Sequence, residues 1–103
     1  MSLDLSIARE YKRRVEGAFN GRVTKMVLFG SRARGDMHEE SDWDIAVFLI
    51  DDPTMDDRHR LSDLGTDLMI DTGQVIQSLA FPSRRDAEDS YLMRAIRSDG
   101  IVL

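Results

Sequence analysis

The chain has 103 residues, of which 42% are hydrophobic and 32% are charged, proportions that are typical of a globular domain. Its 19 acidic and 14 basic residues give a formal net charge of −5, so a nucleic-acid polymer is not the expected partner. The absence of cysteine excludes a disulfide framework and a thiolate metal site. Without a long apolar run or a secretory pattern, we expect a cytoplasmic protein with no membrane association. At this length, residues 1–103 are expected to form one domain.

The first half of the chain is predicted to alternate between helices and strands. Apolar residues recur at steps of three and four over residues 3–19, which predicts a helix that ends at Asn20-Gly21. Residues 23–29 are apolar on both faces near their end and predict a central strand. Residues 30–37 read as a turn that enters a short helix, and residues 43–50 as a second strand.

The second half continues the same alternation. Helices are predicted over residues 55–70 and 83–98, with a third strand over residues 75–81 between them. Tyr91 lies on the apolar stripe of the last predicted helix, as Tyr11 does on the first, so both are expected in the core. Residues 101–103 form a short apolar tail. The order predicts a small α/β (α+β) domain with a mixed sheet of three or slightly more strands.

A turn of small residues follows the first strand. Gly30 lets the backbone approach a phosphate without a Cβ atom in the way, and Ser31 offers a hydroxyl donor beside the amides of the helix start. Arg32 adds a charged donor that could reach a triphosphate. On its own, such a turn is more often structural than functional.

Two carboxylates follow this turn at a spacing that strengthens the functional interpretation. Asp42 and Asp44 are two residues apart at the start of the second strand, so both side chains project from the same face, whereas Trp43 faces the opposite side. Two unpaired carboxylates at this separation repel each other, and a divalent cation relieves the repulsion. The pattern therefore favours a phosphate cradle beside a magnesium site.

These residues resemble a known signature. Gly30-Ser31, ten further residues, and then Asp42-x-Asp44 are similar to the motif of the nucleotidyltransferase superfamily that includes DNA polymerase β. The fuller strings Gly30-Ser31-Arg32-Ala33-Arg34-Gly35-Asp36 and Glu40-Ser41-Asp42-Trp43-Asp44 resemble its small prokaryotic branch, the minimal nucleotidyltransferase (MNT) domains. The resemblance implies the polymerase β-like fold, a small mixed sheet with helices packed on one face.

The resemblance also implies a chemistry. Gly30 and Ser31 would hold the β- and γ-phosphates of ATP, and Asp42 and Asp44 would bind two Mg²⁺ ions and be the catalytic pair. An acceptor hydroxyl would attack the α-phosphate, and pyrophosphate would leave. Many members are antitoxins paired with a HEPN-domain ribonuclease toxin, and such members transfer AMP from ATP to a tyrosine of the toxin.

The sequence departs from the family pattern at a third carboxylate, which belongs on the next core strand. Here that segment reads Gln74-Val75-Ile76-Gln77-Ser78-Leu79 and contains no acid, so Gln77 or Gln74 occupies the neighbourhood. An amide oxygen can contact a metal, but the group is neutral and is no base. Asp71 is close in sequence, but it lies at the end of the predicted helix, where we expect a role in the turn.

Two functions are favoured at this point, and other nucleotidyl acceptors or a regulatory role stay open. The chain is either an adenylyltransferase that modifies its partner, or a catalytically weakened antitoxin that neutralises its partner by binding. A nucleotidyltransferase for a small molecule would need an additional acceptor-binding domain. A homodimer and a heteromer with the partner are both compatible with the sequence.

Overall fold

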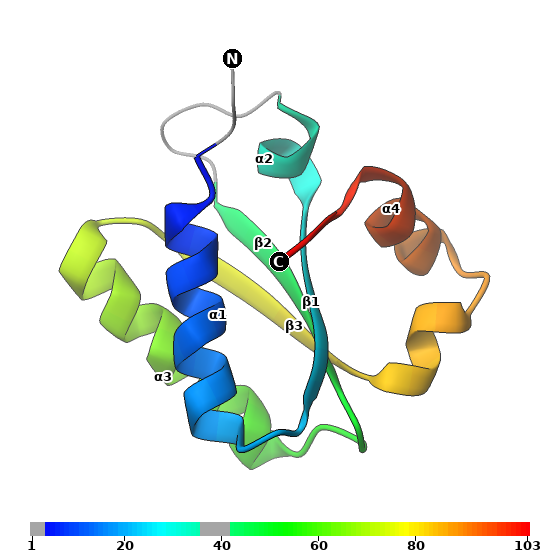
Figure 1. The fold of residues 1–103 in the computed structure, drawn as a ribbon, viewed down its shortest axis with the longest axis horizontal. Helices are drawn as coiled ribbons and strands as arrows, with labels where there is room; N and C mark the ends of the chain where they lie inside the picture. The colour runs from blue at the N-terminus through cyan, green and yellow to red at the C-terminus, as the bar shows by residue number, and fades with distance from the viewer. Residues whose placement is uncertain (1–3, 36–41) are drawn as a thin grey trace.

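A computed structural model describes residues 4–35 and 42–103, so the predicted motif residues Asp36, Glu40 and Ser41 lie outside the described part (Figure 1). None of the helices within these two ranges is long and apolar enough to span a membrane. The elements in chain order are α1 (Ser6–Phe19), β1 (Val23–Phe29), α2 (Gly30–Arg34), β2 (Trp43–Leu49), α3 (Met55–Thr72), β3 (Ile76–Pro82), the 3-10 helix η1 (Ser83–Ala87), α4 (Tyr91–Asp99) and β4 (Ile101–Val102).

The strands form one mixed sheet in the order β3-β2-β1-β4, which confirms the predicted α/β fold with a mixed sheet. β1 pairs antiparallel with β2, and β2 pairs parallel with β3. β1 is central, as its apolar sequence predicted. The apolar tail is a strand of its own, since Val102 and Ile101 pair antiparallel with Val27 and Leu28 of β1.

Helices α1 and α3 cover one face of the sheet side by side (Figure 1). The core on this face contains Tyr11 and Val15 of α1, Leu61 and Leu68 of α3, and the inward residues of β2. Tyr11 is fully buried, as predicted, and its hydroxyl donates a hydrogen bond of 3.0 Å to the Leu61 carbonyl. The phenol thus satisfies its polar end while the ring fills the space between the two helices.

The fourth helix corrects the expectation that all helices pack on one face. Met93 and Ile96 of α4 pack in a second cluster with Val27, Ala46 and Phe48, on the face opposite α1 and α3. Those three strand residues alternate with the residues of the first core, so β1 and β2 are apolar on both faces. A second helical layer is therefore needed to remove this apolar surface from water.

The predicted helix over residues 83–98 is also wrong, because the segment forms two separate elements. η1 ends at Ala87, and α4 begins at Tyr91 after the side chain of Ser90 accepts a hydrogen bond of 3.2 Å from the Met93 amide. This N-cap sets which residues of α4 face inward. Tyr91 consequently lies outside the core with 86% of its surface exposed, contrary to the prediction.

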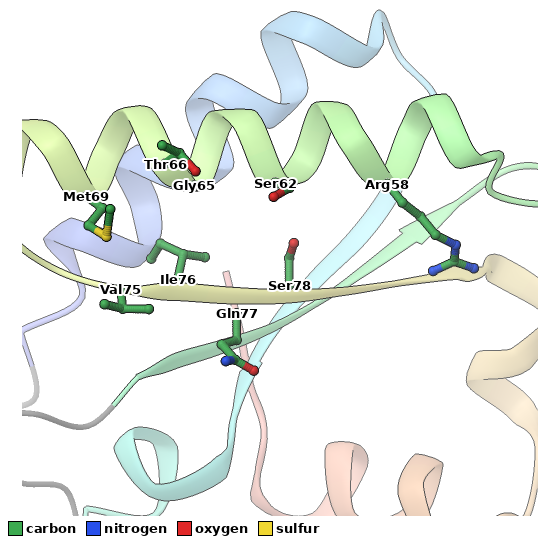
Figure 2. Close-up of a pocket in the computed structure, with 9 residues that line it drawn as sticks. All are labelled: Arg58, Ser62, Gly65, Thr66, Met69, Val75, Ile76, Gln77 and Ser78. Carbon is green, nitrogen blue, oxygen red and sulfur yellow. The ribbon is translucent and has the colours of Figure 1, made fainter.

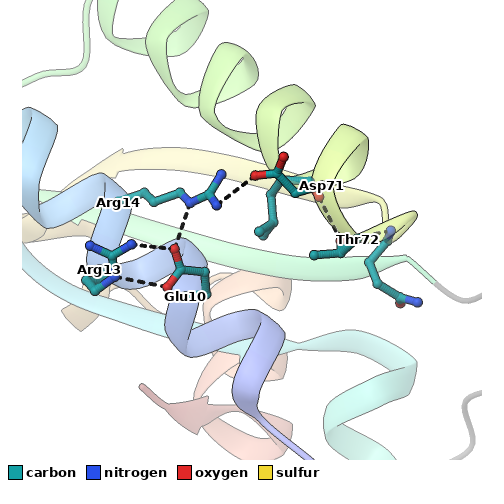
Figure 3. Close-up of polar contacts among 7 residues, drawn as sticks. Glu10, Arg13, Arg14, Asp71 and Thr72 are labelled. Atoms are coloured by element: carbon teal, nitrogen blue, oxygen red, sulfur yellow. Dashed lines mark hydrogen bonds and ion pairs between the residues drawn. The ribbon is translucent and has the colours of Figure 1, made fainter.

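Polar contacts join α1 to the C-terminal end of α3 (Figure 3). Nη2 of Arg14 lies 2.9 Å from an oxygen of Asp71 in the last turn of α3, and its Nε donates to Glu10 at 2.8 Å. Hydrogen bonds from Arg13 and Arg14 lower the pKa of Glu10 to about 2. Asp71 therefore pairs with α1 and takes no part in the third-acid position on β3.

A second ion pair ties the N-terminal end of α3 to the start of β1. Both terminal nitrogens of Arg22 lie 2.8 Å from the Asp57 carboxylate, and one also contacts Asp51. Asp57 is only 5% exposed and forms a capping box with Thr54 at the start of the helix. The hydrogen bonds from Arg22 hold the pKa of Asp57 well below its usual range.

Asp57→Ala is expected to lower the free energy of unfolding by about 2–4 kcal/mol at neutral pH, because it removes a helix cap and leaves Arg22 without its buried partner. The pKa of Asp57 is lower in the folded than in the unfolded chain. The stabilisation by the Asp57 carboxylate is therefore complete at a pH above its pKa in the unfolded chain. It is lost as the pH falls through its pKa in the folded chain.

Urea unfolding of both proteins at neutral and acidic pH measures this effect, and the difference between them should shrink in acid. Asp51→Ala is the matched control, since the exposed carboxylate of Asp51 binds the same arginine. This variant should lower the free energy of unfolding by less than about 1 kcal/mol. Equal losses in the two variants would contradict the account.

Candidate functional site

The turn after β1 packs directly against a carboxylate of β2. Gly30 has a φ of +75°, and a Cβ atom at this residue would stand 3.2 Å from the carboxyl carbon of Asp44 and overlap with its Oδ2. The antiparallel register produces this contact, because Phe29, the last residue of β1, pairs with Asp44. Only glycine combines the left-handed backbone with the missing side chain that the position requires.

Asp42 and Asp44 lie together beside this turn. Asp44 is half-buried in β2, and Asp42 immediately precedes the strand. Burial raises the pKa of Asp44, the charge of Asp42 raises it further, and Arg34 opposes the shift. The structure thus brings the turn and both acids to one place on the sheet, and the acids interact as a pair whose mutual repulsion a cation would relieve.

The residue beside this pair on the next strand is Gln77. In the parallel register of β2 and β3, Asp44 pairs with Gln77, so the two side chains leave the same face of the sheet on neighbouring strands. Among the residues that the structure describes, no group of three or more acidic, histidine or cysteine side chains is placed to hold a metal ion. Two carboxylates and an amide oxygen nevertheless suit Mg²⁺, whose remaining ligands are usually water and phosphate oxygens.

Arg32 lies elsewhere, packed on the indole of Trp43. Its guanidinium carbon is 4.1 Å from the ring centroid, and the side chain is buried. The side-chain oxygen of Gln74 accepts hydrogen bonds from Trp43 at 3.0 Å and from Arg32 at 3.4 Å. These three residues join α2 to β2 and to the segment before β3, on the face opposite Asp44. The contact of Arg32 with a nucleotide stays a prediction.

The packing of Trp43 and Gln74 against Arg32, and the effect of Arg34 on Asp44, were not predicted from the sequence. The alternation of β2 was the available signal for the packing of Trp43, since a tryptophan between two acids on a strand must face away from them. A flat apolar ring is a favourable partner for the arginine of the adjacent helix. Arg34 lies on α2 one helical turn after Gly30 and Ser31, and this position was the available signal for its effect on Asp44.

Residues 16–103 match the family model described as "Polymerase beta, Nucleotidyltransferase". The chain belongs to this nucleotidyltransferase family. The predicted resemblance is therefore confirmed at the level of the family, and members of this family generally use a nucleoside triphosphate and a divalent metal.

Two relatives from Methanocaldococcus jannaschii carry names that specify the reaction further. The nucleotidyltransferase chain is 32% identical to "Putative protein adenylyltransferase MJ0141" over 57 residues. The aligned residues make up 55% of this chain and 58% of that protein. It is 38% identical to "Putative protein adenylyltransferase MJ0604" over 71 residues, and these residues make up 69% of this chain and 66% of that protein. The aligned region thus spans less than two thirds of either relative.

A solved structure agrees with the fold. The nucleotidyltransferase resembles a chain in the complex of tri-AMPylated Shewanella oneidensis HEPN toxin with MNT antitoxin, with a TM-score of 0.58 and 15% identity, over 93% of this chain and 70% of that one. At this identity the likeness concerns the fold alone.

Gly30→Ala is expected to destabilise the nucleotidyltransferase by about 1–2 kcal/mol through its left-handed backbone and, in addition, to displace the Asp44 carboxylate. Gly73→Ala is the matched control, because Gly73 has a φ of +76° and open space around its Cβ position. Thermal unfolding should show that the left-handed backbone lowers the stability of both variants by a similar amount. Binding of a non-hydrolysable ATP analogue with Mg²⁺ should fail in Gly30→Ala alone. Normal binding by Gly30→Ala would contradict the predicted site.

Asp42→Asn is expected to lower the pKa of Asp44 in the metal-free protein, because it removes the negative charge that adds to the effect of burial. An NMR titration of the Asp44 carboxyl carbon measures the change. Asp56→Asn, on the exposed surface of α3, serves as the control and should leave that titration unaltered. An unchanged titration in Asp42→Asn would show that the two acids do not interact.

Proposed function

We propose that this chain is a Mg²⁺-dependent protein adenylyltransferase, the antitoxin of a HEPN-domain toxin, and that it transfers AMP from ATP to a toxin tyrosine. The observation that carries the proposal is the packing of the Gly30 turn against Asp44, with Asp42 alongside. A cradle for phosphates and a pair of metal-binding carboxylates within one site are what nucleotidyl transfer requires.

In this proposal each residue has a separate task. Gly30 and Ser31 would hold the β- and γ-phosphates, and Asp42 and Asp44 would hold two Mg²⁺ ions. When bound, these ions would supply positive charge that offsets the charge of the triphosphate and of the entering and leaving oxygens. The tyrosine oxygen forms a bond to the α-phosphorus, the bond to pyrophosphate breaks, and the phenolic proton passes to water.

The relatives support this choice of reaction and partner. Both M. jannaschii proteins are named as protein adenylyltransferases, and the S. oneidensis complex contains a toxin that carries AMP groups. We further propose that residues 1–103 act as one domain in the cytoplasm. A homodimer or a heteromer with the toxin would complete the assembly.

The second candidate function is neutralisation by binding without transfer. It is favoured by Gln77, a neutral residue that occupies the register position next to Asp44 where the family pattern has a third carboxylate. A neutral amide leaves more positive charge on the bound metal, and it cannot accept the proton of the acceptor.

Incubation of the chain with a HEPN-domain toxin, Mg²⁺ and ATP labelled on its α-phosphate tests the first function. Labelled toxin is expected with the wild type, and labelling should fall at least about a hundredfold, near 2.7 kcal/mol, in Asp42→Asn and in Asp44→Asn. Asp56→Asn is the control. Labelling that persists in both site variants would contradict the catalytic assignment, and unlabelled but neutralised toxin would establish the second function.

Gln77→Glu tests the role of the third position. We expect a transfer rate about tenfold higher, equal to about 1.4 kcal/mol of the barrier, because the new carboxylate adds the missing negative charge beside Asp44. Gln74→Glu is the matched control, because Gln74 lies with Arg32 and Trp43 and should not raise the rate. A rate in Gln77→Glu equal to or below that of the wild type would contradict this role.

A further inference from the structure

β3 leaves one edge of its backbone available within the described part of the chain. It is the outermost strand of the sheet, and the Trp43 amide donates to the Val75 carbonyl, so Val75 turns its peptide groups toward β2. Peptide groups alternate along a strand, and those of Ile76 and Ser78 therefore point away from β2. By the same alternation the carbonyl of Ala80 points away from β2, and it accepts a hydrogen bond of 3.2 Å from Arg58 of α3.

A groove runs along this edge between β3 and α3 (Figure 2). It has a volume of about 310 Å³, and polar side chains of α3 form one wall, among them Ser62 and Thr66. Ile76 and Ser78 point toward α3, whereas Gln77 points to the other side of the sheet (Figure 2). A helix and a free strand edge that flank a groove are the arrangement in which an extended peptide adds a strand to a sheet.

We propose that the acceptor protein docks here as an extended segment that pairs with β3, with backbone hydrogen bonds to Ile76 and Ser78. This inference rests on the proposed transfer to a protein. In such a segment, alternate side chains enter the groove below α3, and the others lie on the face that carries Gln77 and Asp44. The first set would select the acceptor, and the second would present the hydroxyl to the transfer site.

The spacing of the strands favours a long acceptor side chain. Asp44 and Gln77 are register partners, so a residue added opposite Gln77 would stand two strand spacings from Asp44, about 9.6 Å. A tyrosine side chain extends across most of this distance over Gln77, whereas the hydroxyl of a serine or threonine stays close to its own backbone. The geometry thus selects tyrosine within an extended segment.

The edge is too short to favour a second copy of this chain as the occupant. Arg58 covers the Ala80 carbonyl, and Pro82 has no amide to donate, so strand pairing is confined to the start of β3. A stable dimer usually buries about 1,200–2,000 Å², and a segment of this length offers only a few hydrogen bonds. Weak and reversible pairing suits a substrate that must leave after the transfer.

Amide hydrogen exchange, followed residue by residue by NMR, tests the strand addition. When the toxin used in the labelling assay is added, the amides of Ile76 and Ser78 are expected to exchange at least tenfold more slowly. Those of Gln77 and Leu79 already face β2 and act as controls within the same strand. Unchanged exchange at Ile76 and Ser78 would overturn the proposal. Protection that appears without toxin and grows with protein concentration would also overturn it, in favour of self-association.

A groove-filling variant provides the kinetic test. Thr66→Trp is expected to lower toxin labelling at least tenfold through a raised KM for the toxin, while binding of an ATP analogue stays unchanged. Asp67→Trp is the matched control, because the neighbouring Asp67 is exposed on the same helix outside the groove lining. Wild-type labelling by Thr66→Trp would overturn the docking site and leave the proposed function intact. Absence of labelling by the wild type would instead contradict the proposed function.

Discussion

The site depends on the direct packing of the Gly30 backbone against the Asp44 carboxylate. The contact requires a left-handed glycine at the end of β1 and an antiparallel register that places Phe29 opposite Asp44. A side chain at position 30 would occupy the space of the carboxylate. A shift of the register by one residue would turn Asp44 into the core and Trp43 toward the side of the sheet that now carries Asp44. The placement of Gly30 beside Asp44 is therefore fixed by the pairing of two strands.

The two faces of β2 provide opposite environments beside this contact. On one face, Arg32, Trp43 and Gln74 hold α2 against the sheet through stacking and two hydrogen bonds to a single amide oxygen. On the other face, burial and the charge of Asp42 raise the pKa of Asp44, so its ionised form costs folding energy. Carboxyl groups with a pKa shifted by burial and by a neighbouring charge cluster at functional sites.

The sequence was sufficient to predict most of the local elements and the pair of acids, since period-two alternation in β2 separates Asp44 from Trp43. It did not reveal where the last helix begins or the contacts between residues far apart in the chain. The start of residues 83–98 resembles a capping box, and this concealed the actual N-cap of α4 at Ser90, which leaves Tyr91 exposed in the first turn of the helix. The choice between Gln74 and Gln77 required the register of β3. Arg32 carries a charge that suits phosphate, and only tertiary packing places it on an aromatic ring.

The most direct test of the account replaces Mg²⁺ with paramagnetic Mn²⁺ in the presence of a non-hydrolysable ATP analogue and records the amide NMR signals. The ion should broaden the signals of Gly30, Ser31 and Gln77 first, because the phosphate turn and the acids would share one site. The acidic segment from Asp51 to Asp57 at the start of α3 is the competing location for a cation. Broadening confined to that segment, with Gly30 unaffected, would contradict the account.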